Sequence, residues 1–101
     1  MAKPDKLLPE EAKRTILLIL EQGYVEYSYH CLQDSMPKRK VTTLDVVSTL
    51  QTGQIIRDPE WDENYQNWKY RVEGVDMETD ELTVITVIFA AGLTLYIITV
   101  F

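Results

Sequence analysis

The stretch Leu82–Phe101 reads LTVITVIFAAGLTLYIITVF and contains no charged residue, so its twenty residues are long enough to cross a bilayer as a helix. However, eleven of the twenty are β-branched Thr, Val or Ile, which lose rotamer freedom in a helix and pack well on a pleated sheet. Ala90-Ala91-Gly92 divides the stretch into two pieces of strand length, and Gly92 can supply the positive φ of a short loop. The sequence therefore predicts a C-terminal β-hairpin over residues 82–101.

The residues before this stretch also argue against a membrane anchor. Asp76, Glu78, Asp80 and Glu81 are acidic, and no Lys or Arg stands beside the apolar stretch as it does next to many membrane spans. A tail-anchored membrane protein is the third alternative for this chain. Recovery of the full-length chain without detergent would exclude it.

The chain has the length of a single domain, 101 residues, in which we expect residues 1–8 to be a flexible N-terminal segment. It shows no basic and apolar leader, and its single cysteine, Cys31, excludes an intrachain disulfide, so we expect a cytoplasmic protein. One Cys and one His predict no metal site, and no cofactor is expected. The net charge of −6 is unusual for a protein that binds nucleic acid.

The first half of the chain has helical patterns. Pro9-Glu10-Glu11 is typical of a helix start, and Gly23 is suited to end that helix after an apolar face that includes Ala12, Ile16 and Ile19. Residues 24–29 alternate as a short strand does, and one or two helical turns over 30–36 should end at Pro37.

A further helix is predicted to begin at Thr42 or Thr43 and to run to about Gln51, because Asp45 follows closely enough to form a capping box. We expect Leu44, Val47 and Leu50 to face inward.

The second half has strand patterns. Residues 68–75 alternate, with Trp68, Tyr70 and Val72 on one face and Lys69, Arg71 and Glu73 on the other, and Ile55-Ile56 is a shorter apolar run. The segments 58–63 and 76–81 are predicted to be acidic loops. The order of elements predicts an α+β fold in which two or three N-terminal helices pack on one face of an antiparallel sheet of three to four main strands.

A series of short motifs runs through residues 13–101: Gly23-Tyr24-Val25, Ser28-Tyr29-His30, Arg39-Lys40-Val41-Thr42, Asp45-Val46-Val47, Leu50, Gly53, Ile55-Ile56, Trp68–Gly74 and Ile97-Ile98-Thr99-Val100. In this order they resemble a family of short bacterial domains of unassigned function with a Ser-x-His motif, followed by an Arg before a Val/Ile-Thr helix start. These domains are considered relatives of the RelE- and MqsR-like toxins, the ribonuclease halves of toxin–antitoxin pairs. The chain departs from the family at Asp34 and Ser35, where a second Arg is common, and in its acidic charge.

The resemblance implies a RelE/MqsR-like fold and a metal-independent endoribonuclease of the mRNA interferase type. It implies catalytic roles for His30 as acid or base, for Arg39 on the phosphate, and for Tyr70 or Tyr96 as a stacking or hydroxyl group. The basic residues implied to contact RNA are Lys38, Lys40, Lys69 and Arg71. The implied partners are RNA, free or on the ribosome, an antitoxin-like protein, and a second copy of the chain, with no membrane.

Each of these residues also has a structural interpretation. His30 can be a hydrogen-bonding residue beside a helix, the 38–40 cluster a solvated loop, and the Tyr24, Tyr27 and Tyr29 group part of the packing of the sheet. The segments 58–63 and 76–81 hold eight of the sixteen acids, and if both lie at the opposite end of the sheet a local positive patch survives.

The second functional class is a non-catalytic protein-binding module of the same fold. The predicted hairpin is apolar on both faces, with Val84 and Ile88 on one and Ile85, Val87 and Phe89 on the other. One face must be covered by something other than the helices, either the N-terminal segment, a second copy or an antitoxin-like partner. A neighbouring gene for a small DNA-binding protein would favour the toxin function.

Overall fold

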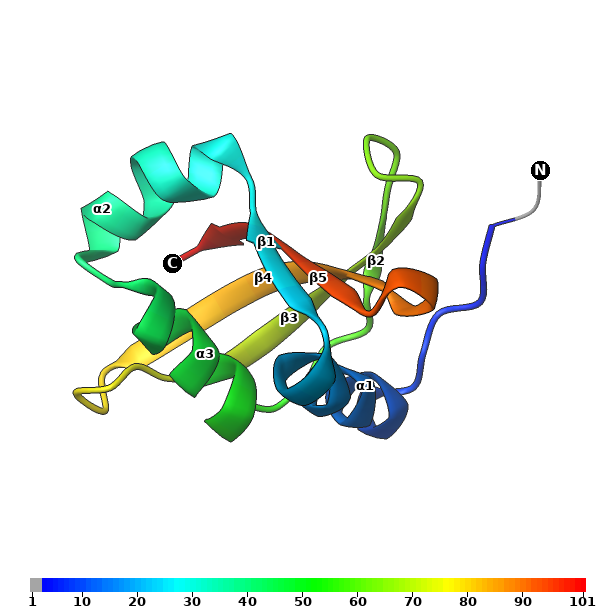
Figure 1. Ribbon diagram of the computed structural model, residues 1–101, viewed down its shortest axis with the longest axis horizontal. Helices are drawn as coiled ribbons and strands as arrows, with labels where there is room; N and C mark the ends of the chain where they lie inside the picture. The colour runs from blue at the N-terminus through cyan, green and yellow to red at the C-terminus, as the bar shows by residue number, and fades with distance from the viewer. Residues whose placement is uncertain (1–2) are drawn as a thin grey trace.

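The computed structural model describes residues 3–101 and shows an α+β fold in which helices pack against one sheet (Figure 1). The helical elements are α1 (Pro9–Gln22), the π-helical turn η1 (Cys31–Ser35), α2 (Met36–Arg39), α3 (Thr43–Thr52) and the short 3₁₀ turn η2 (Ala90–Gly92). The strands are β1 (Tyr24–Tyr27), β2 (Glu60–Asp62), β3 (Asn67–Val75), β4 (Glu81–Phe89) and β5 (Thr94–Val100).

The sheet is mixed, with five strands in the order β1-β5-β4-β3-β2. Neighbouring strands are antiparallel except β1 and β5, which run parallel. The predicted antiparallel sheet of three to four strands was therefore wrong in strand number and in one pairing. β2 has only three residues and lies inside the segment 58–63 that reads as an acidic loop. The direction of β1 depends on its pairing with a strand about seventy residues later, which no local pattern reveals.

Residues 82–101 form β4 and β5, which pair antiparallel across the turn η2. The left-handed backbone position in this connection is Leu93, with φ 47°, and Gly92 does not have a positive φ. Within residues 3–101, every helix is too short or too polar to traverse a bilayer.

Of the N-terminal segment predicted to be flexible, residues 1–2 lie outside the described residues. The remainder of that segment lies against β3, where the Pro4 carbonyl accepts a hydrogen bond from Trp68 Nε1 at 2.7 Å. The backbone N–H of Leu7 donates to the hydroxyl of Tyr70 at 2.8 Å. The segment thus covers the end of the helical side of the sheet.

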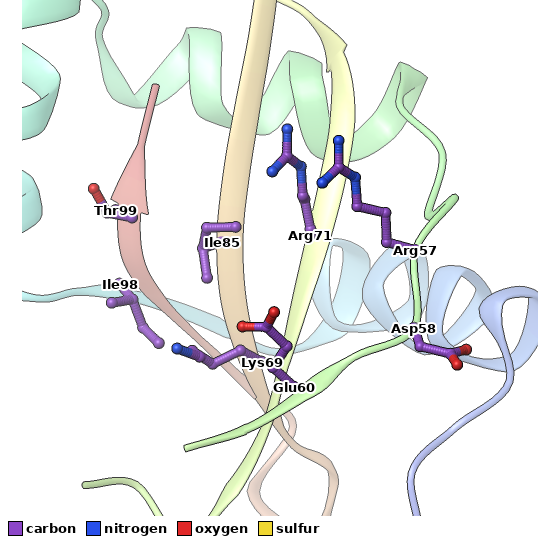
Figure 2. Close-up of a pocket in the computed structure, with 8 residues that line it drawn as sticks. All are labelled: Arg57, Asp58, Glu60, Lys69, Arg71, Ile85, Ile98 and Thr99. Atoms are coloured by element: carbon purple, nitrogen blue, oxygen red, sulfur yellow. The ribbon is translucent and has the colours of Figure 1, made fainter. Parts of the chain in front are cut away.

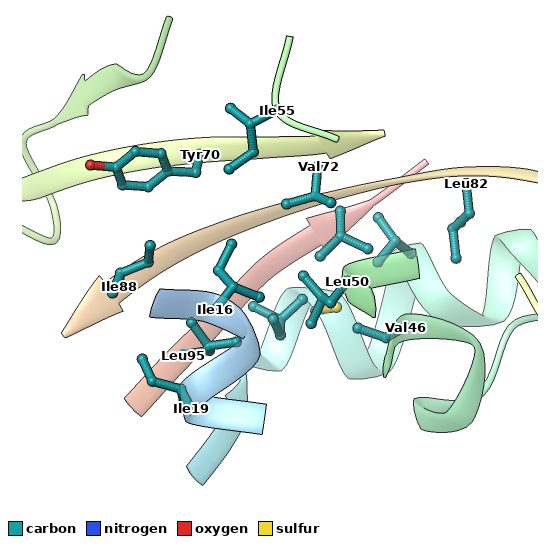
Figure 3. Close-up of a cluster of buried hydrophobic side chains, with 14 of the residues drawn as sticks. Ile16, Ile19, Val46, Leu50, Ile55, Tyr70, Val72, Leu82, Ile88 and Leu95 are labelled. Atoms are coloured by element: carbon teal, nitrogen blue, oxygen red, sulfur yellow. The ribbon is translucent and has the colours of Figure 1, made fainter. Parts of the chain in front are cut away.

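The main core lies between the sheet and the helices, where apolar side chains from both layers meet (Figure 3). In α1, the predicted inward residues Ala12, Ile16 and Ile19 are completely buried. They pack with residues such as Leu95 and Ile97 of β5, which alternate toward the helices.

The inward face of α3 differs from the predicted one. Leu50 is buried as expected, but Leu44 is 67% exposed, and the residues completely buried with Leu50 are Val46 and Thr49. The hydroxyl of Thr49 donates to the Val75 carbonyl at 3.0 Å, so this polar side chain is satisfied inside the core. A polar residue in the inward stripe shifts the apparent helical phase of the sequence.

Pro37 was predicted to end the helical turns after His30, but the helical run continues to Arg39. The turn before the proline is π-helical, with the N–H of Met36 donating to the carbonyl of Cys31 five residues earlier. A widened turn removes the steric conflict that a proline ring makes with the preceding α-helical turn. Pro37 is therefore accommodated near the start of α2.

Asp45 links the start of α3 to the loop between β3 and β4. Its carboxylate accepts hydrogen bonds from the backbone N–H groups of Thr42 at 2.8 Å and Met77 at 2.9 Å, and these bonds lower its pKa below the ordinary value. Because the folded pKa is the lower one, the stabilisation is present above the unfolded-state pKa and is lost as pH falls through the folded value.

We expect Asp45→Asn to be less stable than wild type at pH 7, and to have nearly the same stability at pH values below the folded-state pKa of Asp45. Urea unfolding at pH 7 and at such acidic pH values measures the difference in the free energy of unfolding between the two proteins. An equal loss of stability at every pH would contradict the prediction.

Candidate functional site

The face of the sheet opposite the helices carries the candidate site. On β3, Lys69 and Arg71 alternate with the buried Tyr70 and Val72, and they point away from the helical layer (Figure 2). A cavity of about 220 Å³ opens on this face. It is lined by Arg57, Asp58, Glu60, Lys69, Arg71, Ile85, Ile98 and Thr99.

Two arginines that line this cavity share one carboxylate, that of Glu73, which is not among the lining residues. Arg57 Nε lies 3.9 Å and Arg71 Nη2 3.7 Å from the two oxygens of Glu73. Arg57 is brought there by a backbone bridge in which Gln54 and Glu73 exchange both hydrogen bonds, at 2.9 and 3.0 Å. Two positive charges thus meet one negative charge.

Arg71 retains unused hydrogen-bonding capacity. Its Nε atom is buried and has no acceptor among the described residues, whereas buried polar atoms are ordinarily satisfied. The Cζ atom of the guanidinium group lies 5.0 Å from the ring centroid of Phe101, a cation–π contact. The geometry leaves Arg71 a donor for an anion in the cavity.

Lys69 is the third cation of the cavity. Its ammonium lies 3.5 Å from the Asp62 carboxylate, and Glu60 is its cross-strand partner on β2. The acidic segment 58–63 therefore adjoins the basic side chains rather than lying at the opposite end of the sheet. The cations that line the cavity thus lie among the carboxylates of Asp58, Glu60 and Asp62.

His30 lies at the edge of the same face. Its Nε2 is 3.3 Å from the hydroxyl of Thr99, a residue that lines the cavity. Its Nδ1 is 3.6 Å from the Asp34 carboxylate, whose other oxygen is 3.3 Å from the ammonium of Lys38. His30 is thus positioned between a carboxylate and the rim of the cavity.

The backbone before His30 is fixed by Ser28. The N–H of Ser28 donates to the carbonyl of Ile97 at 2.9 Å, and its hydroxyl donates to the carbonyl of Ile98 at 2.6 Å. The Ser28 hydroxyl also accepts the N–H of Cys31 at 2.9 Å. The serine of the Ser-x-His motif therefore joins the start of the helical run to β5.

Tyr96 lies on the same face of the sheet as Lys69, since both are register partners of Val87. Its ring centroid is 5.1 Å from that of Tyr65, which comes from the loop between β2 and β3. Burial, and then a hydrogen bond with Tyr96, raises the pKa of Tyr65 above its ordinary value. The pair forms an aromatic surface on the cavity side of the sheet.

The other residues proposed from the sequence lie elsewhere. Tyr70 is 3% exposed on the helical side, where its hydroxyl accepts the Leu7 N–H, and its pKa is raised chiefly by burial. Arg39 donates to the carbonyl of Glu81, and Lys40 is exposed in a left-handed conformation after α2. Of the residues proposed from the sequence, Lys69 and Arg71 line the cavity, and His30 contacts Thr99 at its rim. Lys38 shares the Asp34 carboxylate with His30, and Tyr96 lies on the same face of the sheet as Lys69.

Sequence reasoning missed three members of the site: Arg57, Tyr65 and Thr99. Arg57 follows the short apolar run Ile55-Ile56, and only the bridge between Gln54 and Glu73 aligns it with Arg71. Thr99 is one of many β-branched residues in its strand, so its position next to His30 had no distinguishing local signal.

A model of the family described as Domain of unknown function (DUF4258) matches residues 27–101, which include His30 and every residue that lines the cavity. No curated protein and no solved structure matches the chain significantly. In residues 3–101, no group of three His, Cys, Asp or Glu side chains is arranged to hold a metal ion.

Proposed function

The chain belongs to the DUF4258 family, a family of unknown function, and we propose that its open sheet face is the active site of a metal-independent endoribonuclease of the toxin type. The observation that supports this proposal best is the contact of His30 with Thr99 at the rim of the cavity that holds Arg57, Lys69 and Arg71. A group able to move protons thus contacts the rim of a cavity that is also lined by cations able to bind a phosphate.

The proposed reaction begins at the ribose 2′-hydroxyl, whose proton passes to a ring nitrogen of His30. The 2′-oxygen then attacks the adjacent phosphorus, and Arg57 and Arg71 stabilise the charge that develops on the non-bridging oxygens. The bond from phosphorus to the 5′-oxygen breaks, and Lys69 protonates that oxygen. The products are a 2′,3′-cyclic phosphate and a 5′-hydroxyl end.

The aromatic pair gives this reaction a surface for a base. Tyr65 and Tyr96 lie on the same side of the sheet as Lys69, and aromatic side chains stack with unpaired bases of single-stranded RNA. A RelE/MqsR-like relationship and an antitoxin-like partner belong to the same proposal.

The test is induced expression in a bacterial host, with growth followed and new RNA 5′ ends mapped. We expect the wild-type chain to arrest growth and create such ends, and Arg71→Gln to weaken cleavage at least about tenfold, because a hydrogen bond to a charged group is lost. The matched control is Arg14→Gln, an exposed arginine of α1 remote from the open sheet face. Equal soluble levels with no cleavage by the wild-type chain would contradict the proposal.

The runner-up is a non-catalytic protein-binding module, and the edge strand β1 favours it. Within residues 3–101, β1 pairs only with β5, so its other side offers unpaired backbone groups, and its first residue, Tyr24, is 70% exposed. An extended segment of a partner can add to such an edge. A Val25→Pro variant that retains RNA cleavage but loses its partner would separate the two functions.

A further inference from the structure

We propose that the carboxylate of Glu73 occupies an anion-binding site between Arg57 and Arg71 in the free protein and competes there with the phosphate of the substrate. This inference rests on the proposed function and names how its site is regulated. Among residues 3–101, Glu73 is the one carboxylate within ion-pair distance of both arginines.

The contacts of Glu73 with the two arginines are weak enough for an incoming phosphate to replace its carboxylate. Both ion-pair distances, 3.9 and 3.7 Å, exceed the range of a well-formed hydrogen bond, so neither arginine is tightly bound to it. Arg71 Nε, inside the same cluster, has no acceptor at all among the described residues. A phosphate has more acceptor oxygens than a carboxylate and can satisfy both guanidinium groups at once.

The exchange requires only a side-chain movement. The backbone of Glu73 is fixed on both sides, by its bridge to Gln54 and by its register with Thr83 on β4. Its side chain is 29% exposed and can rotate toward solvent while the strand stays in place. Arg71 remains positioned by Phe101 throughout.

The competition predicts which anions the site accepts. A single small anion must compete with the carboxylate of Glu73. The effective concentration of this carboxylate is high, because Glu73 belongs to the same chain and lies beside the anion-binding site. A chain of phosphates gains a second contact at Lys69 and replaces Glu73 more readily. We therefore assign the site to polyanions with successive phosphates rather than to isolated phosphate.

The test is binding, measured by calorimetry at constant ionic strength, of inorganic phosphate and of a 2′-O-methyl oligonucleotide that cannot be cleaved by 2′-hydroxyl attack. The full chain is compared with Glu73→Gln and Glu73→Asp. We expect Glu73→Gln to bind both probes about tenfold more tightly than wild type, because two weak competing ion pairs are lost. We also expect the ratio of its affinity for the oligonucleotide to its affinity for phosphate to be smaller than in wild type. Glu73→Asp should show a smaller gain.

The control is Glu60→Gln, which removes the same charge from the wall of the cavity rather than from the carboxylate that the two arginines share. Its expected gain is at most about twofold, the effect of a screened surface charge. Equal gains in the two variants, no gain in Glu73→Gln, or no binding by any variant would each overturn the inference. Tight binding without RNA cleavage would overturn the proposed nuclease alone, and cleavage by wild type without tighter binding in Glu73→Gln would overturn this inference alone.

Discussion

His30→Ala is expected to lower RNA cleavage by about 10²–10⁴-fold, the range that acid–base assistance contributes to enzymatic rates. The reason is geometric: Nε2 lies 3.3 Å from Thr99 at the cavity rim, while Nδ1 faces Asp34. Counts of new RNA 5′ ends per unit of soluble protein, taken with the growth rate, measure the loss.

The matched control for this prediction is Tyr29→Ala. Tyr29 is the neighbouring residue and is 80% exposed, so its removal perturbs the same segment of chain without touching the cavity. The acid–base role would be contradicted if His30→Ala cleaved RNA at a rate within threefold of wild type and unfolded at the same temperature as wild type. A His30→Ala chain that fails to fold leaves His30→Gln as the second variant, which retains a side chain able to hydrogen-bond to Thr99.

Leu50→Ala is expected to reduce the free energy of unfolding by about 2–5 kcal/mol, as large-to-small substitutions in a packed core do. The side chain of Leu50 is completely buried between α3 and the sheet, so the vacated volume cannot be filled by solvent without exposing apolar surface. Urea unfolding at pH 7 measures the change. Since small domains are stable by only about 5–15 kcal/mol, this variant approaches the limit of folding.

Leu44→Ala provides the comparison within the same helix. Leu44 is 67% exposed, so we expect its truncation to change stability by less than about 0.5 kcal/mol. The sequence pattern assigns Leu44 and Leu50 to one face, whereas the structure separates them. Similar losses in the two variants would support the sequence-based face of α3 and contradict the structure.

The sequence predicted those features that depend on local chemistry. The apolar face of α1, the start of α3 with its capping box at Thr42 and Asp45, and the alternation on β3 all follow from neighbouring residues. The pattern on β3 also placed Lys69 and Arg71 on a face away from the core. These two residues are the part of the candidate site that sequence could supply in detail.

The remainder depends on contacts between distant segments. The parallel pairing of β1 with β5 and the position of Arg57 beside Arg71 are set by where the chain returns to the sheet. The inward Thr49 and the π-helical turn before Pro37 are local features that sequence patterns did not predict. Thr49 is a polar residue at an inward helix position, and the helical run continues past Pro37 instead of ending there. Tyr70 was proposed from the sequence as a catalytic residue because of its hydroxyl, but it faces the helical side of the sheet, where that hydroxyl accepts the Leu7 N–H.

The pairing of β1 with β5 has a consequence for the newly synthesised chain. His30 and Thr99 are separated by 69 positions, and among the described strands only β5 pairs with β1. At translation rates of roughly 5–20 residues per second, that interval lasts about 3–14 s. During this time a nascent chain has His30 but lacks its contact with Thr99, so the proposed nuclease site is incomplete until the last strand is made.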